Sequence, residues 1–221
     1  MVDLQNYLKS TEVIDSDSQA VKEKAQSLIQ ELQTDREKAI ALFYYVRDVI
    51  KHNPNAPQQF PDDIKASYTL ERGNGFCWHK VVLLVALARA AGIPARLGLV
   101  DTRDYQLSEK ILPIFGGDNI VIVHAYAELY LGGKWVHASP VYDLETCRKA
   151  GFVPVGFDGL NDAKDSVYNL KGERHIEHIK DHGHFDDFPF EYIGEYSQEW
   201  VAQIGGKWSE YQQYVKKHEI R

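Results

Sequence analysis

Apolar residues recur at helical spacing through the first third of the chain. A first amphipathic helix is predicted over residues 18–32, where the apolar positions are 20, 21, 25, 28, 29 and 32. A second helix is predicted over 36–50, with Asp35 as its N-cap and Glu37 in its first turn. The prolines that follow at positions 54 and 57 end this helix, because proline cannot continue one.

The central stretch 77–91 is apolar on nearly every side, which predicts a buried helix. The Gly-Asn-Gly sequence at 73–75 is typical of a turn, and it leads the chain tightly into this helix. Gly92 and Pro94 end the helix, since glycine fits the position after a helix and proline cannot extend it. A strand is predicted next, over residues 95–100.

Strict alternation marks residues 120–131 as a strand, with apolar side chains at the odd positions and polar or aromatic ones at most even positions. The glycine pair 132–133 predicts a hairpin turn, and 134–139 the returning strand. In this register the apolar residues meet on one face. His124 and Ser139 then share the opposite, polar face. The predicted pairs are Leu131 with Lys134, Leu129 with Val136 and Ala127 with Ala138.

Beyond Pro140 the pattern is weaker. A short helix is predicted over 144–150, irregular chain with short strands over 152–195, and a helix over about 195–217. There is no internal repeat. We expect one α+β domain over residues 1–221, with a core of about 12–143 and a divergent C-terminal extension over 144–221.

Composition narrows the classes of function. The 25 basic and 32 acidic residues give a net charge of −7, which argues against a nucleic-acid partner and, with no basic cluster, against an anionic membrane surface. No apolar run is long enough to cross a membrane. Two cysteines make no disulfide framework, and residues 1–17 lack an apolar signal core, so a cytoplasmic location is expected.

Cys77 is the candidate nucleophile. It begins the buried helix, where backbone N–H groups favour a thiolate and can hold an oxyanion. The alternative is a buried, inert thiol, which is common for a lone cysteine. His79 lies two residues on and cannot face Cys77, so we expect it at the surface or behind the site. His124, held on a strand, is the better base.

A third group is needed to orient the imidazole. Ser139 lies one pair from His124 on the same face, and Asp143 comes near if the strand continues past Pro140. Neither is a clear carboxylate partner, so both stay candidates.

Two segments carry a family resemblance. GNGFCWHKVVLLVALARAAGIPARLG and HAYAELYLGGKWVHASP resemble the nucleophile segment and the histidine hairpin of transglutaminase-like domains. The resemblance covers residues 12–143. It implies a papain-like α+β fold, in which a buried cysteine-bearing helix packs on an antiparallel sheet that carries the histidine. It also implies a Cys–His–Asp triad, with Cys77 as nucleophile and His124 as base. Ser139 occupies the position where the family usually has aspartate.

The resemblance implies a cysteine hydrolase or acyltransferase that attacks an amide bond of a peptide, isopeptide or glutamine side chain through a thioester on Cys77. A peptide or protein is therefore the expected substrate, and no cofactor is expected. Because of Ser139, the alternative is a non-catalytic binding or scaffold domain that keeps the fold. A coenzyme A-dependent arylamine acetyltransferase is a weaker third reading, since the chain has no phosphate-cradling loop.

Four histidines cluster in the C-terminal extension, at positions 175, 178, 182 and 184. Such a cluster suits a transition metal, but no cysteine joins it and the spacing matches no zinc site. We therefore expect solvated loop histidines and no bound metal.

Overall fold

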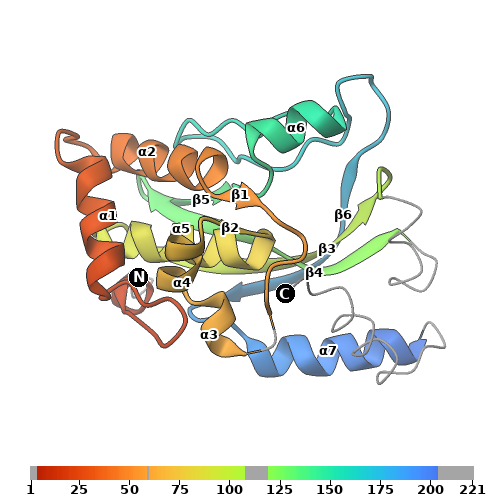
Figure 1. Cartoon of the computed structure of the whole chain (residues 1–221), viewed down its shortest axis with the longest axis horizontal. Coiled ribbons are helices and arrows are strands. Elements are labelled where there is room, and N and C mark those ends of the chain that lie inside the picture. Colours follow the sequence, from red (N-terminus) through yellow and green to blue (C-terminus); the bar gives the residue numbers. More distant parts are fainter. Residues whose placement is uncertain (1–3, 59, 108–118, 204–221) are drawn as a thin grey trace.

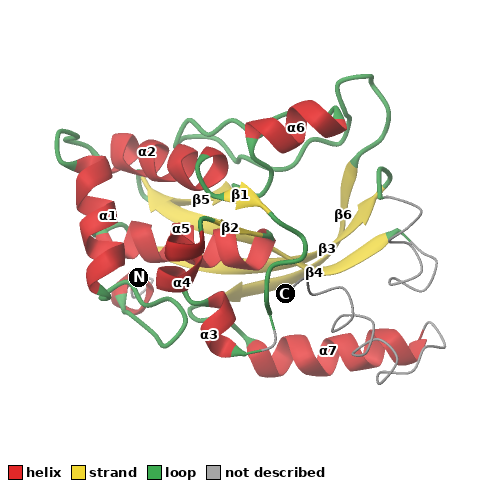
Figure 2. Cartoon of the chain, viewed as in Figure 1, coloured by secondary structure: helices red, strands yellow, loops and turns green. Residues whose placement is uncertain are grey.

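The computed structural model describes residues 4–58, 60–107 and 119–203. Its centre is a four-stranded antiparallel sheet of order β5-β4-β3-β6, with helices packed over it (Figures 1 and 2). This arrangement confirms the predicted α+β class. Within the described ranges no helix is long and apolar enough to cross a membrane.

The helices and strands have the following bounds. The helices are a 3₁₀ turn η1 at Leu4–Leu8, then α1 Gln19–Ile29, α2 Asp35–Asp48, α3 Pro61–Ile64, α4 Ala66–Arg72, α5 Cys77–Ala90, α6 Leu144–Ala150 and α7 Phe190–Gln203. The strands are β1 Lys51–His52, β2 Asn74–Gly75, β3 Ala95–Asp104, β4 Ile120–Leu131, β5 Lys134–Ala138 and β6 Ile176–Phe185.

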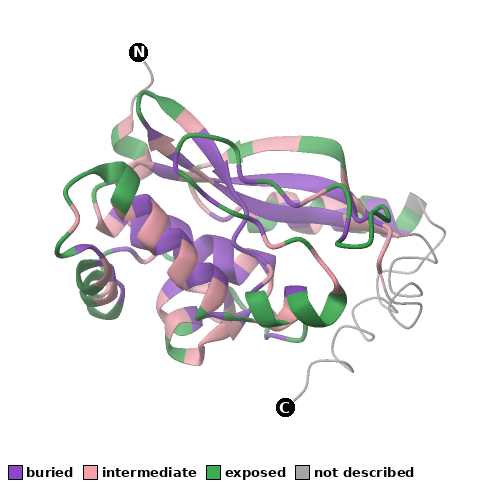
Figure 3. Cartoon of the chain, turned by 90° about the horizontal axis from the view of Figure 1, so that it is seen from above, coloured by how far each residue is buried: buried purple, intermediate pink, exposed green. Residues whose placement is uncertain are grey.

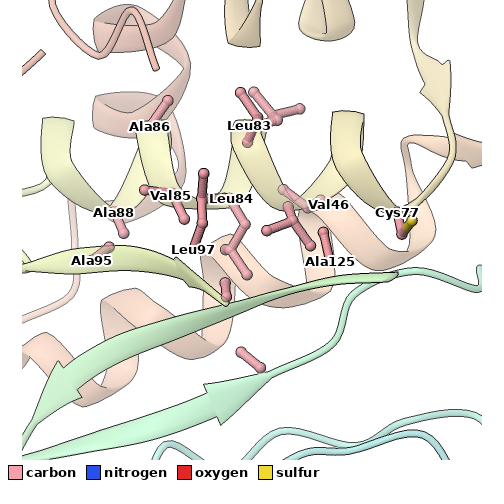
Figure 4. Packing of buried hydrophobic residues seen from close by; sticks show 14 of the residues in the cluster. Val46, Cys77, Leu83, Leu84, Val85, Ala86, Ala88, Ala95, Leu97 and Ala125 are labelled. Carbon is pink, nitrogen blue, oxygen red and sulfur yellow. The ribbon is translucent and has the colours of Figure 1, made fainter. Parts of the chain in front are cut away.

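Helix α5 forms the core of the fold. It packs between the sheet and helices α1, α2 and α4, and nearly all of its side chains are buried. This position explains why its sequence is apolar on almost every side. Figure 4 shows its side chains lying against β3 and β4, with Cys77 at one end of the row. The buried residues, purple in Figure 3, are concentrated in α5 and the sheet.

One predicted cap was wrong by one residue. Thr34, not Asp35, caps α2: its hydroxyl accepts the N–H of Glu37, and the Glu37 carboxylate accepts the N–H of Thr34. This reciprocal pair satisfies two backbone donors that a helix start leaves open.

The predicted hairpin register is confirmed. Strands β4 and β5 pair Leu131 with Lys134, Leu129 with Val136 and Ala127 with Ala138. Near its other end β4 is irregular: its pairing with β3 shifts between Val100 and Thr102. Val123 has φ of 47°, a left-handed conformation. This irregularity immediately precedes His124.

The C-terminal extension is more regular than expected. Residues 176–185 form β6, which pairs with β3 along its length and completes the sheet. Pairing with β3 satisfies the backbone of this polar segment, although its side chains show no apolar alternation. The predicted C-terminal helix begins earlier, as α7 at Phe190, and the part of it beyond residue 203 lies outside the described residues.

Candidate active site

The chain is tightly packed where it enters α5. Gly73, with φ of 71°, ends α4 in the left-handed conformation that glycine adopts without strain. Asn74 and Gly75 then form β2, which runs parallel to β1. A Cβ at Gly75 would lie 2.4 Å from Cβ of His79, so only glycine fits there. These contacts place Cys77 as the first residue of α5.

Cys77, at the start of α5, and His124, on β4, are both buried and interact with each other. Their exposed fractions are 9% and 8%, and the two side chains lie close enough for the charge of Cys77 to raise the pKa of His124. The Trp78 indole Nε1–H also donates to the Val123 carbonyl oxygen at 2.8 Å. The residue after the cysteine is therefore tied to the residue before the histidine.

A carboxylate that the sequence interpretation did not consider completes the cluster. Asp165 Oδ2 lies 3.6 Å from His124 Nε2, and it accepts a hydrogen bond from the Ser139 hydroxyl at 2.8 Å. The chain around Asp165 runs beside β5, where the N–H of Ser139 donates to the carbonyl of Ala163 at 3.0 Å. Serine at the usual aspartate position thus contacts a carboxylate that comes from a later segment.

The charges of this cluster favour a protonated imidazole. Burial lowers the pKa of His124, but the charge of Cys77 and the carboxylate of Asp165 outweigh burial and raise the pKa to about 10. Burial raises the pKa of Asp165, whereas the interaction with His124 and the hydrogen bond from the Ser139 hydroxyl lower it, and the net shift is downward. Asp165 is therefore ionised beside a cationic His124.

A second buried carboxylate, that of Asp104, also senses the charge of His124. Burial raises the pKa of Asp104, although the Gln106 N–H and the charges of His175 and His124 act in the opposite direction. The pKa values of Asp104 and Asp165 are thus shifted in opposite directions, and it is Asp165 whose Oδ2 lies 3.6 Å from His124 Nε2.

Asp143, the other candidate for the third group, has a different position. Its carboxylate caps α6 by accepting the N–H groups of Glu145 and Thr146 at 3.0 and 3.1 Å. It also accepts the N–H of His52, in β1, at 2.7 Å. It also accepts the hydroxyl of Thr146 at 3.0 Å. Asp143 therefore joins α6 to the β1–β2 pair that leads into Cys77, and these hydrogen bonds do not involve His124.

His79 lies in the interior, behind the site, and not at the surface, which was the other position expected for it. It is fully buried, with Nε2 2.8 Å from the carbonyl oxygen of Pro57. Its Nδ1 accepts the N–H of Phe76 at 3.4 Å, which steadies the residue before Cys77.

His178 and His184 are exposed, as expected, but they lie on strand β6 rather than in a loop, and His175 is buried. The side chain of His182 is fully buried, with Nε2 2.8 Å from Asp101 and Nδ1 2.6 Å from the Tyr192 hydroxyl. His184 Nε2 lies 3.1 Å from Glu128. Among the residues that the structure describes, no group of three or more histidine, cysteine or acidic side chains is arranged to hold a metal ion.

Comparison with known proteins gives the fold and the family. A "Putative Cysteine Protease" from Cytophaga hutchinsonii aligns with 86% of this chain and 58% of its own length, at 16% identity and a TM-score of 0.50. A "Putative Protease" from Parabacteroides distasonis aligns with 58% of this chain and 26% of its own, at 18% identity and a TM-score of 0.40. The periplasmic domain of TgpA from Pseudomonas aeruginosa, bound to ethylmercury, aligns with 54% of this chain and 42% of its own, at 22% identity and a TM-score of 0.39.

This chain therefore spans less than two thirds of each of these proteins. No curated protein matched its sequence. The sequence profile of one family does match it over residues 22–140, more than half of its length and a span that contains both Cys77 and His124. The chain belongs to the transglutaminase-like superfamily.

Proposed function

We propose that this protein is a cysteine-dependent hydrolase or acyltransferase that attacks an amide bond through a thioester on Cys77. One observation carries the proposal: Cys77, His124 and Asp165 lie together in the order nucleophile, base and orienting carboxylate. This order is the one that nucleophilic catalysis by a thiol requires.

In the first half of the proposed reaction, His124 holds the proton of the Cys77 thiol, and the sulfur attacks the amide carbonyl carbon. Backbone N–H groups in the first turn of α5 have no acceptor within the helix, so they are suited to receive the developing oxyanion. His124 then gives its proton to the leaving nitrogen, the C–N bond breaks, and an amine or ammonia leaves. The acyl group remains on sulfur as a thioester.

In the second half, His124 takes a proton from water or from an acceptor amine as that molecule attacks the thioester. The C–S bond breaks and the thiol recovers its proton. Water gives a carboxylic acid, and an amine gives a new amide. Asp165 stabilises the imidazolium that forms in both halves, a role that Ser139 alone could not fill because a hydroxyl carries no charge.

The proposed substrate is a peptide, an isopeptide or a glutamine side chain. Membership of the superfamily supports an amide substrate, and the name of the Cytophaga hutchinsonii protein supports a peptide. The competing proposal, a binding or scaffold domain, rested on the missing aspartate at position 139. The carboxylate of Asp165 beside His124 weakens that argument.

The test is the alkylation of Cys77 by iodoacetamide, measured in a Cys147→Ala background so that only one thiol reacts. Near pH 6.5 we expect Cys77 to react at least about tenfold faster with His124 present than in His124→Ala, because an imidazolium partner favours the thiolate. Equal rates in the two proteins would overturn the catalytic proposal and favour a binding domain. A parallel screen incubates the protein with peptides and glutamine-containing compounds. Mass spectrometry then detects any thioester on Cys77 and so identifies the acyl donor.

A further inference from the structure

The backbone at Val123 is unusual for its residue type. Its φ of 47° is left-handed, a conformation that crowds a β-branched side chain and is a rare outlier for valine. Such a conformation persists only where surrounding contacts hold it, and it is found most often at functional sites. Val123 immediately precedes His124, so its backbone angles set the direction of the imidazole.

Two hydrogen bonds hold the backbone of Val123, one on each side. Its N–H donates to Asp101 Oδ1 at 2.9 Å, and its carbonyl accepts the Trp78 indole N–H at 2.8 Å. Through Trp78 the second bond reaches the residue next to Cys77. The first bond reaches β3 at the point where the pairing of β3 with β4 shifts.

Asp101 is held in turn by the C-terminal extension. It is 4% exposed and has two more donors besides the N–H of Val123. His182 Nε2, from β6, lies 2.8 Å from Oδ1, and the Tyr196 hydroxyl, from α7, donates to Oδ2 at 2.5 Å. Tyr192, also on α7, is hydrogen-bonded to the other nitrogen of His182 at 2.6 Å. One buried carboxylate therefore joins β3, β4, β6 and α7.

We propose that Asp101 is a positioning residue for His124, and that β6 and α7 act in catalysis by holding Asp101 through His182 and Tyr196. The proposal rests on the function proposed above and extends it to the part of the chain beyond residue 144. Figure 1 shows β6 beside β3 at the edge of the sheet and α7, in blue, below the sheet in this view.

Val123 stays left-handed only while its backbone contacts hold it there, and the bond to Asp101 is one of the two described above. A charged acceptor forms stronger hydrogen bonds than a neutral one, so the carboxylate opposes the backbone strain. Without it, Val123 relaxes toward an extended conformation, the peptide before His124 turns, and the ring moves relative to Cys77. A misplacement of about 1 Å at a reacting group lowers rates by as much as about 100-fold.

Three variants test this: Asp101→Ala, Asp101→Asn and Tyr196→Phe, all made with Cys147→Ala. Asp101→Ala removes the acceptor for the Val123 N–H, and we expect Cys77 alkylation near pH 6.5 to fall by about 10-fold to 100-fold. Asp101→Asn keeps an acceptor oxygen and is expected to recover most of the rate. Tyr196→Phe removes one of the three donors to Asp101, and its alkylation rate is expected to lie between those of Asp101→Ala and Asp101→Asn.

A second readout does not depend on catalysis. NMR titration of the His124 ring should show its pKa falling from the raised value toward about 6.5 in Asp101→Ala and staying raised in Asp101→Asn. If wild-type alkylation turns out not to depend on His124, the catalytic proposal fails, and the titration still decides whether Asp101 positions the ring. Tyr44→Phe, which removes a hydroxyl that accepts the N–H of Phe157 at 3.2 Å, is the control for a lost buried hydrogen bond.

An Asp101→Ala protein with circular dichroism and unfolding like those of Tyr44→Phe, but with unchanged His124 titration, would overturn the proposal. If the alkylation rate of Cys77 and the pKa of His124 fall to the same extent in Asp101→Ala and Tyr44→Phe, the proposal is also overturned, since that result indicates general destabilisation. If Asp101→Ala does not fold, Asp101→Asn compared with Tyr196→Phe decides: titrations equal to wild type in both contradict the positioning role.

Discussion

The charge of Asp165 can be removed without changing its shape, and this is the sharpest test of the cluster around His124. Asp165→Asn keeps an amide of similar size at the end of the Ser139 hydrogen bond. The carboxylate lies 3.6 Å from His124 Nε2, and both side chains are buried. Two unit charges about 4 Å apart interact by about 4 kcal/mol at an effective dielectric constant of about 20, or about three pKa units.

Burial of the two groups offsets part of this energy, so a shift of about one to three units is expected when the charge is lost. The pKa of His124, about 10 with Asp165 present, should fall to between about 7 and 9 in Asp165→Asn. NMR titration of the imidazole measures the shift directly. Cys77 alkylation near neutral pH should fall in parallel, by about 10-fold or more.

A double variant tests whether the charge or the residue matters. Asp165→Ser combined with Ser139→Asp returns a carboxylate to the position that the superfamily usually employs. We expect Asp165→Ser alone to lower the alkylation rate and the double variant to recover a large part of it. Asp143→Asn is the control, since Asp143 bonds to the backbone of α6 and β1. An unchanged His124 pKa in Asp165→Asn would refute the assignment.

Two further predictions concern buried groups near the site. Burial lowers the pKa of Lys80 to about 7, although the charges of Asp143 and Asp48 act in the opposite direction. Because the folded pKa lies below the unfolded one, the unfolded chain binds more protons between pH 7 and about 10.4, so this group makes stability rise with pH there. Urea unfolding at pH 7 and pH 9 measures this change. The free energy of unfolding should rise less between the two pH values in Lys80→Met than in wild type, and equal rises would contradict the reasoning. Gly98→Ala should lower the free energy of unfolding by about 1–3 kcal/mol, because the new Cβ would lie 2.1 Å from Cζ of Tyr126. Adding Tyr126→Leu should recover part of this loss in the same urea assay, and no recovery would point to a different cause.

The parts of the molecule that the sequence predicted well are those with a local pattern. Helix α5 is apolar all round and is buried all round, and the β4–β5 hairpin has the register that its alternation required. His124 could be selected over His79 for the same reason, because strand and helix geometry decide which side chain can face Cys77.

The parts that escaped depend on contacts between distant segments. Asp165 lies 26 residues from Ser139 in irregular chain, where no periodicity shows which residue turns inward. One indirect indication was present in the sequence. Because serine occupies the usual aspartate position, a carboxylate beside His124 has to come from elsewhere in the chain. Short strands were predicted within residues 152–195, but the ten-residue β6 was not located, because it is stabilised by pairing with β3 and its polar side chains do not alternate.

The position of Asp165 has a consequence for how relatives of this protein are sorted into active and inactive members. The family profile ends at residue 140, and the acidic group beside the histidine comes 25 residues later, from a segment that the profile does not cover. Position 139, taken alone, shows no carboxylate for the histidine. What the imidazole requires is a negative charge at one place in space, and chains that differ in this column of an alignment can supply it from different parts of the backbone. Inspection of the space around the histidine, rather than of a single column, is the appropriate criterion.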